Sequence, residues 1–164
     1  MASENVVVTE TELEITVSCM INASPADVWD AWTNPDKITY WWGPSGFTST
    51  ITEMDLIPGG RWKLIMHGPD GKEYPNEFTY EAVHEPKFLI LTHHQSLEFN
   101  LRAWNIVVTF EKVGNKTKVT MSDRFKDEEE KAKHVNNFNA VAGAKETFTR
   151  LTTFFEQNLM EEII

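Results

Sequence analysis

The chain has 164 residues, a formal net charge of −10 and one cysteine, Cys19. Nucleic acids and anionic membrane surfaces bind clusters of Lys and Arg, and this sequence has no basic stripe, so neither partner is expected. A single cysteine excludes an intramolecular disulfide and fits a reducing compartment. Residues 1–5 lack the basic start and apolar stretch of a signal peptide, and no apolar run approaches the about 18 residues of a membrane span. These features predict one cytoplasmic domain.

Aromatic residues are frequent, with six Trp and ten Phe. Each such side chain buries about 150–250 Å², so a core built from them is large and packs unevenly. Uneven packing leaves room for a void inside the fold. A plain aromatic core without a void is the alternative that the composition leaves open.

The first part of the chain is predicted to form one strand and two short helices. Apolar and polar residues alternate between positions 6 and 22, which is the period of a strand with one solvated face. Ser24-Pro25 begins a helix, because Ser caps free N–H groups and Pro is tolerated at the first helical position. The same pattern at Asn34-Pro35-Asp36 predicts a second helix to about residue 40, which Trp41-Trp42-Gly43-Pro44 ends.

Residues 47–125 show the pattern of six strands joined by turns. Trp104, Ile106, Val108 and Phe110 give the clearest alternation, so they share one face of a strand. Turn signals separate the strands, and these are Pro58-Gly59-Gly60, Pro69-Asp70-Gly71-Lys72, Glu85-Pro86 and Gly114-Asn115.

The period changes to that of a helix near the C-terminus. From about Asn139 to Leu159, apolar residues recur at steps of three and four, which is one stripe of an amphipathic helix. A helix of this length spans roughly 30 Å and can cover the apolar face of the sheet. The acidic segment 127–131 before it is interpreted as a solvated turn or short helix, or alternatively as a docking face for a basic partner. The order of elements predicts an α+β domain.

Several short motifs occur together along the chain. They are Ser24-Pro25-Ala26-Asp27-Val28-Trp29, Trp41-Trp42-Gly43-Pro44, Pro58-Gly59-Gly60-Arg61-Trp62, Pro69-Asp70-Gly71-Lys72, Glu85-Pro86 and Gly143. In this order and spacing they resemble the START-like (SRPBCC, birch-pollen-allergen-like) superfamily, and within it the group of homologues of the activator of the 90-kDa heat-shock protein ATPase. The resemblance runs from about Leu13 to Leu159 and implies a single START-like domain over residues 1–164.

The resemblance implies a helix-grip fold. In this fold a curved antiparallel sheet, here of about six to seven strands, wraps around a long C-terminal helix, and two short helices follow the first strand. A pocket between the sheet and that helix binds apolar molecules in many members. The chain departs from the family pattern at Ala82, where members often carry an acid, and at Phe88, where they often carry Arg. Both departures predict a less polar pocket.

The predicted binding residues come from the concave face of the sheet and from the C-terminal helix. Trp42 is either a gate at the pocket mouth or a plug at one end of the core. As ligand contacts the large side chains would form a mostly apolar pocket, and as plain core they would pack directly on the helix. The predicted set is Trp42, Trp62, Leu64, Met66, Phe78, Tyr80, Trp104, Ile106, Val108, Phe110, Met121, Phe148, Leu151 and Phe155.

Few polar residues fall near the predicted pocket. His93, Arg102 and Asp123 are candidate polar anchors, with a solvent-facing strand end as the alternative for Asp123. His93 and His94 are adjacent on a strand and point to opposite faces, so no metal site is predicted. No serine or cysteine has a recognisable base partner, so no catalytic residue is predicted.

Three functions remain open from the sequence. The leading hypothesis is non-enzymatic binding of a small apolar or amphipathic molecule in the cavity between the sheet and the C-terminal helix. One alternative, implied by the resemblance, is a co-chaperone-like interaction module that regulates a heat-shock ATPase. The other is a cyclase- or hydrolase-type enzyme that uses the same cavity. No cofactor is expected, and a monomer or a homodimer fits the sequence equally.

Overall fold

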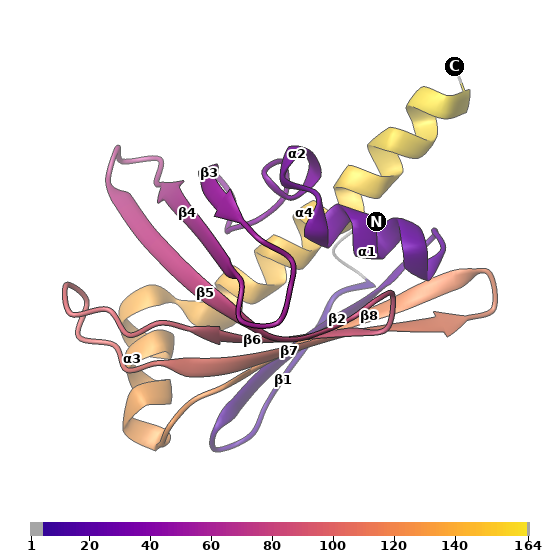
Figure 1. Cartoon of the computed structure of the whole chain (residues 1–164). Coiled ribbons are helices and arrows are strands. Elements are labelled where there is room, and N and C mark those ends of the chain that lie inside the picture. The colour runs from indigo at the N-terminus through magenta and orange to yellow at the C-terminus, as the bar shows by residue number, and fades with distance from the viewer. Residues whose placement is uncertain (1–4, 164) are drawn as a thin grey trace.

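The computed structural model describes residues 5–163, with side chains described up to residue 158. Within that range, eight antiparallel strands form one sheet in the order β1-β2-β8-β7-β6-β5-β4-β3 (Figure 1). Each strand pairs with its neighbour in sequence, except that β2 pairs with β8. The strands are β1 (Val7–Glu10), β2 (Glu14–Ile21), β3 (Thr48–Met54), β4 (Arg61–His67), β5 (Glu73–His84), β6 (Phe88–His93), β7 (Trp104–Val113) and β8 (Lys116–Arg124).

The N-terminal segment forms a hairpin, where the sequence predicts a single strand over residues 6–22. The side chain of Thr11 accepts a hydrogen bond from the Glu14 N–H at 3.1 Å, and the Thr11 N–H donates to the Glu14 carbonyl at 3.0 Å. These two contacts close a tight turn that separates β1 from β2. The sheet therefore has eight strands, rather than the six to seven expected.

The two short helices begin where the capping pattern predicts. Helix α1 (Pro25–Thr33) is capped by Ser24, whose side chain accepts from the Asp27 N–H. Helix α2 (Pro35–Ile38) is capped by Asn34 in the same way. Trp41 follows α2, is fully buried, and donates its indole N–H to the Ala31 carbonyl at 3.1 Å. This contact fastens the end of α2 to α1.

Two helices close the chain. Helix α3 (Glu128–Phe138) occupies the acidic segment, and its cap Asp127 accepts from the Glu130 N–H at 2.9 Å. Asn139 ends it with a left-handed φ of 52°, and α4 (Ala140–Ile163) follows directly. Figure 1 shows α4 crossing the sheet and continuing beyond it. Leu159, the last residue of the predicted apolar stripe, lies outside the described side chains.

The core lies between the sheet, α1 and α4. Phe148 and Leu151 of α4 are fully buried there. The Trp32 ring lies edge-on to Phe148 at 6.0 Å and to Trp41 at 4.8 Å between ring centroids. These rings fill the centre of the core. No helix within residues 5–163 is long and apolar enough to cross a membrane.

Candidate functional site

A cavity of about 200 Å³ lies between the end of the sheet, α3 and the first turns of α4. Its wall is mostly apolar and contains several aromatic rings. Residues predicted from the sequence that border it are Trp42, Met66, Phe78, Trp104, Ile106 and Met121, with His93 and Asp123 as polar members. Further bordering residues are Ile15, Val17, Gly43, Pro44, Asn76, Phe125, His134, Phe138, Ala140, Gly143, Ala144 and Thr147.

The other predicted pocket residues do not border this cavity. A separate void of about 10 Å³, room for about one water, lies deeper under the sheet. Of these remaining residues, Trp62, Tyr80 and Val108 border that small void, while Leu64, Phe110, Phe148 and Leu151 are buried core. Phe155 is half-buried against the α1 side of the molecule. These residues pack against one another and against α1, whose Trp32 also borders the small void.

Strand pairing lines up the polar end of the cavity. Phe78 of β5 pairs with His93 of β6, which pairs with Trp104 of β7, so the three side chains form one row. The His93 and Trp104 rings stack at 4.0 Å between centroids with 9° between planes. The Trp104 indole N–H donates to Asp123 Oδ2 of β8 at 3.1 Å. His93, Trp104 and Asp123, from the ends of β6, β7 and β8, therefore contact one another in sequence across the sheet.

Both ring nitrogens of His93 lie close to oxygen atoms. Its Nδ1 donates to the His94 carbonyl at 2.8 Å, and its Nε2 lies 2.6 Å from Asn76 Oδ1. Burial lowers the pKa of His93 to about 4, so the ring is neutral at pH 7. His94 faces the other side of the sheet and contacts Thr79 and Glu77. Among the described residues, no three His, Cys, Asp or Glu side chains lie close enough to hold a metal ion.

Asp123 faces the cavity from an apolar row of the sheet. Its strand neighbours are Ile15 of β2 and Ile106 of β7, both buried. Burial raises the pKa of the Asp123 carboxyl to about 7, and the hydrogen bond from Trp104 offsets only part of that rise. The side chain keeps some accessible surface and borders the cavity. A carboxyl group in this position takes up and releases a proton near neutral pH.

Helix α3 supplies two cavity residues that sequence reasoning missed. His134 and Phe138 both border the cavity, and His134 lies edge-on to Trp104 at 4.3 Å between centroids. Burial lowers the pKa of His134 to about 4, and its Nε2 has no hydrogen-bond partner among the described residues. Glu130, His134 and Phe138 are spaced by four, which places them on one helix face. That spacing is the signal from which they could have been predicted.

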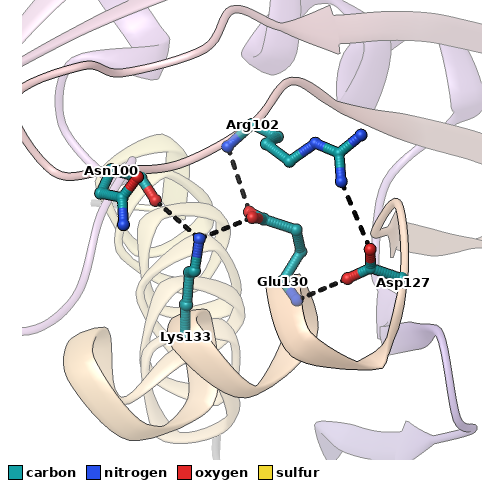
Figure 2. A network of polar contacts seen from close by, with 5 residues as sticks. All are labelled: Asn100, Arg102, Asp127, Glu130 and Lys133. Carbon is teal, nitrogen blue, oxygen red and sulfur yellow. Dashed lines mark hydrogen bonds and ion pairs between the residues drawn. The ribbon is translucent and has the colours of Figure 1, made fainter.

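A polar network fastens α3 to the loop between β6 and β7 (Figure 2). Glu130 is 4% exposed and accepts from the Arg102 backbone N–H at 3.1 Å and from Lys133 Nζ at 2.7 Å. Lys133 also donates to the Asn100 carbonyl at 3.1 Å. Burial raises the pKa of Glu130, but these hydrogen bonds outweigh it and the pKa lies below its ordinary value. The network thereby holds the helix that carries His134 against the cavity.

Arg102 belongs to this network and not to the cavity wall, where the sequence places it as a polar anchor. Its side chain is exposed and Nη1 lies 3.3 Å from Asp127 Oδ2. The physical reason is that the charged group reaches solvent and an acidic partner at the helix start, and so avoids burial in an apolar cavity.

The opposite wall is formed by the segment 42–44, which Arg150 of α4 holds in place. The Arg150 guanidinium donates to the carbonyls of Tyr40, Trp42, Gly43 and Pro44 at 2.9–3.3 Å. Gly43 has a φ of 102°, which residues with a side chain rarely adopt, so the backbone favours glycine there. Trp42 is half-buried and borders both the cavity and the smaller void, as do Phe78, Ile106 and Met121.

The two departures from the family pattern lie away from the cavity. Ala82 follows an irregularity in the pairing of β5 with β6, and Phe88 stacks on His84 at 5.1 Å between centroids. Neither residue borders the cavity. The polar side chains that border the cavity are those of Asn76, His93, Asp123, His134 and Thr147, and neither of these two positions is among them.

Several solved structures share this fold. A protein from Arthrobacter aurescens superimposes with a TM-score of 0.86 at 22% identity, over 93% of this chain and 92% of its own. A protein from Mycobacterium smegmatis gives a TM-score of 0.79 at 24% identity, over 93% and 99%. An AHSA1-like protein from Aeromonas hydrophila gives 0.61 at 20% identity, over 85% and 94%. These likenesses confirm the helix-grip fold.

Sequence comparison identifies the family. No curated protein matches the chain significantly. The family described as Activator of Hsp90 ATPase homolog 1-like protein matches residues 22–156. That range contains α1, the strands from β3 to β8, and α3, and it confirms the resemblance seen in the motifs. The chain therefore belongs to the family of Activator of Hsp90 ATPase homolog 1-like proteins.

Proposed function

We propose that this protein binds a small apolar or amphipathic molecule in the cavity between the sheet, α3 and α4, and that it does so without catalysis. The observation that carries the proposal is an aromatic-walled cavity of about 200 Å³ beside a core whose deeper void measures about 10 Å³. Apolar surface removed from water on binding stabilises a complex by about 25 cal/mol per Å² before the costs of association.

The size of the cavity limits the ligand. A cavity of about 150 Å³ lined by apolar side chains holds benzene. Scaling from that case, about 200 Å³ accommodates about eight non-hydrogen atoms, which is one aromatic ring with a short substituent. Trp104 and Phe78 on one side, and Phe138 on the other, offer ring surfaces to such a molecule.

Two measurements test the proposal. Native mass spectrometry of the freshly purified protein is expected to show a mass excess from a bound small molecule. Titration with ethylbenzene and acetophenone, followed by chemical-shift changes in the protein, is expected to show saturable binding. The proposal is abandoned if the purified protein carries no added mass and neither probe produces saturable shifts.

A cavity-filling variant locates the binding site. Ala144 borders the cavity, so Ala144→Phe is expected to weaken probe binding at least about tenfold by occupying the space. Lys145 is the exposed next residue of α4, and Lys145→Leu adds apolar volume outside the cavity as the matched control. Equal effects of the two substitutions would place the probes elsewhere on the protein.

A second candidate function follows from the family description, which names an activator of the Hsp90 ATPase. In that case contact with the chaperone would use exposed surface, such as the apolar side chains of Tyr40 and Leu97. Measuring the ATPase rate of purified Hsp90 with and without this protein tests the idea. An unchanged rate at saturating protein counts against it, whatever the result for small molecules.

A further inference from the structure

Asp123 is the feature of the cavity that limits which polar group a ligand can carry. Its Oδ2 accepts from Trp104, while Oδ1 makes no hydrogen bond with any residue that the structure describes. No Lys or Arg borders the cavity, so neither a carboxylate at Asp123 nor an anionic ligand finds a counter-charge there. An ion moved from water into such a site without a partner loses several kcal/mol of solvation.

We propose that Asp123, in its protonated form, donates a hydrogen bond from Oδ1 to an acceptor oxygen of an uncharged ligand of about one aromatic ring. An aromatic ketone, ester or ether oxygen is the chemical class that fits. This inference rests on the proposed binding function and adds the identity of the polar group. Asp123 is then the residue that orients the ligand, with its ring among the aromatic side chains.

The raised pKa of Asp123, about 7, agrees with this role, because the proton that must be donated stays on the carboxyl up to neutral pH. The neighbouring groups support it. The other titratable residues that border the cavity are His93 of β6 and His134 of α3, and both are neutral at pH 7. The remaining neighbours of Asp123, on β2 and β7, are Ile15, Trp104 and Ile106, which carry no charge.

The orientation of the hydrogen bond is set by Trp104. The indole is fixed between His93, which stacks on one face, and His134, which meets it edge-on. Because its N–H occupies Oδ2, the free oxygen of Asp123 is the one left for a ligand. His93 is held by the hydrogen bond from its Nδ1 to the His94 carbonyl and stacks on the indole, so it acts as support for the indole.

A set of matched probes tests the proposal, with dissociation constants from chemical-shift titration at pH 6. Ethylbenzene has the shape but no acceptor, acetophenone adds a carbonyl oxygen, 1-phenylethylamine adds a cation and benzoate adds an anion. Asp123→Leu is expected to weaken acetophenone binding about fivefold to tenfold and to leave ethylbenzene unchanged within about twofold. Asp123→Asn retains a neutral donor, so acetophenone binding is expected to stay within about threefold of the wild type.

A second readout uses pH. In the wild-type protein, acetophenone binding is expected to weaken above pH 7, as the donated proton is lost, while ethylbenzene binding stays level. Asp123→Asn is expected to remove this pH dependence. Glu111→Gln on the exposed outer face of β7 is the matched control. It is expected to leave the pH dependence of acetophenone binding and of ethylbenzene binding as in the wild type.

The possible outcomes separate the two proposals. If no probe binds the wild type, the binding function itself fails. If ethylbenzene and acetophenone both bind but Asp123→Leu weakens them equally, the binding function stands and the role of Asp123 is refuted. Tighter binding of 1-phenylethylamine than of acetophenone, lost in Asp123→Asn, would show that a carboxylate recognises cations and would also overturn the inference.

Discussion

Asp123→Asn is expected to stabilise the folded protein at pH 8 by about 4 kcal/mol. The pKa of the carboxyl rises from 3.8 in the unfolded chain to about 7 in the fold. This difference of about 3 corresponds to about 4 kcal/mol, at about 1.36 kcal/mol for each pKa unit. Asn has nearly the same shape, keeps an oxygen for the Trp104 N–H and does not ionise, so the variant never places a buried charge in this apolar row.

The direction with pH follows from proton binding. Between pH 3.8 and about 7 the folded protein keeps the Asp123 proton that the unfolded chain has lost, so rising pH lowers the stability of the wild type over this range. His93 and His134 act in the opposite direction, because their pKa values fall from 6.5 to about 4 in the fold. Both histidines are present in both proteins, so their contribution cancels in the difference.

Urea unfolding at a series of pH values measures this difference. The two proteins are expected to have equal free energies of unfolding near about pH 3.5. As the pH rises, the free energy of unfolding of the variant is expected to exceed that of the wild type by a growing amount, until the difference becomes constant above about pH 7. A gap that does not change with pH would refute the reasoning, and so would a variant less stable than the wild type at pH 8. Either result would mean that the Asp123 carboxylate is well solvated.

Substitutions at three other positions test the supports of the cavity by urea unfolding. Arg150→Met is expected to lower the free energy of unfolding by about 2 kcal/mol, because four carbonyls lose a charged donor. Arg150→Lys is expected to lower it by about half as much. A decrease below about 0.5 kcal/mol for Arg150→Met would contradict the anchoring role. Gly43→Ala is expected to cost about 1–2 kcal/mol through its positive φ, and an unchanged midpoint would count against this. Glu130→Gln is expected to cost about 1–2 kcal/mol and to speed amide exchange in α3, because the charged contact with Lys133 is lost; slower exchange would refute it.

The strands and their inward faces were predictable because alternation has a local cause. Trp104, Ile106 and Val108 share the concave face, as predicted from their period of two. Alternation identifies a face, but it does not say which part of that face is filled by other core side chains. Val108 is therefore predicted on the pocket wall, whereas it borders a much smaller void together with Trp32 of α1.

The residues that were missed depend on contacts between distant parts of the chain. Arg150 holds carbonyls that lie 106 to 110 positions earlier, and no local pattern reports such a contact. His134 could be placed on one face of a helix by its spacing from Glu130 and Phe138. Which way that face points depends on the left-handed Asn139 and on the network around Glu130, and both are visible only in the folded chain.

The pairing of β2 with β8 has a consequence for the order of folding. Val17 pairs with Met121, so the N-terminal hairpin gains its second neighbour only after more than a hundred further residues have been made. Closing a loop of this length has a large entropic cost, and folding rates fall as the paired residues lie further apart in the sequence. During synthesis β3 to β7 can pair in succession, whereas β2 waits with its apolar face uncovered. The last strand to leave the ribosome is thus the one that joins the two halves of the sheet, and β8 carries Asp123 into place as it does so.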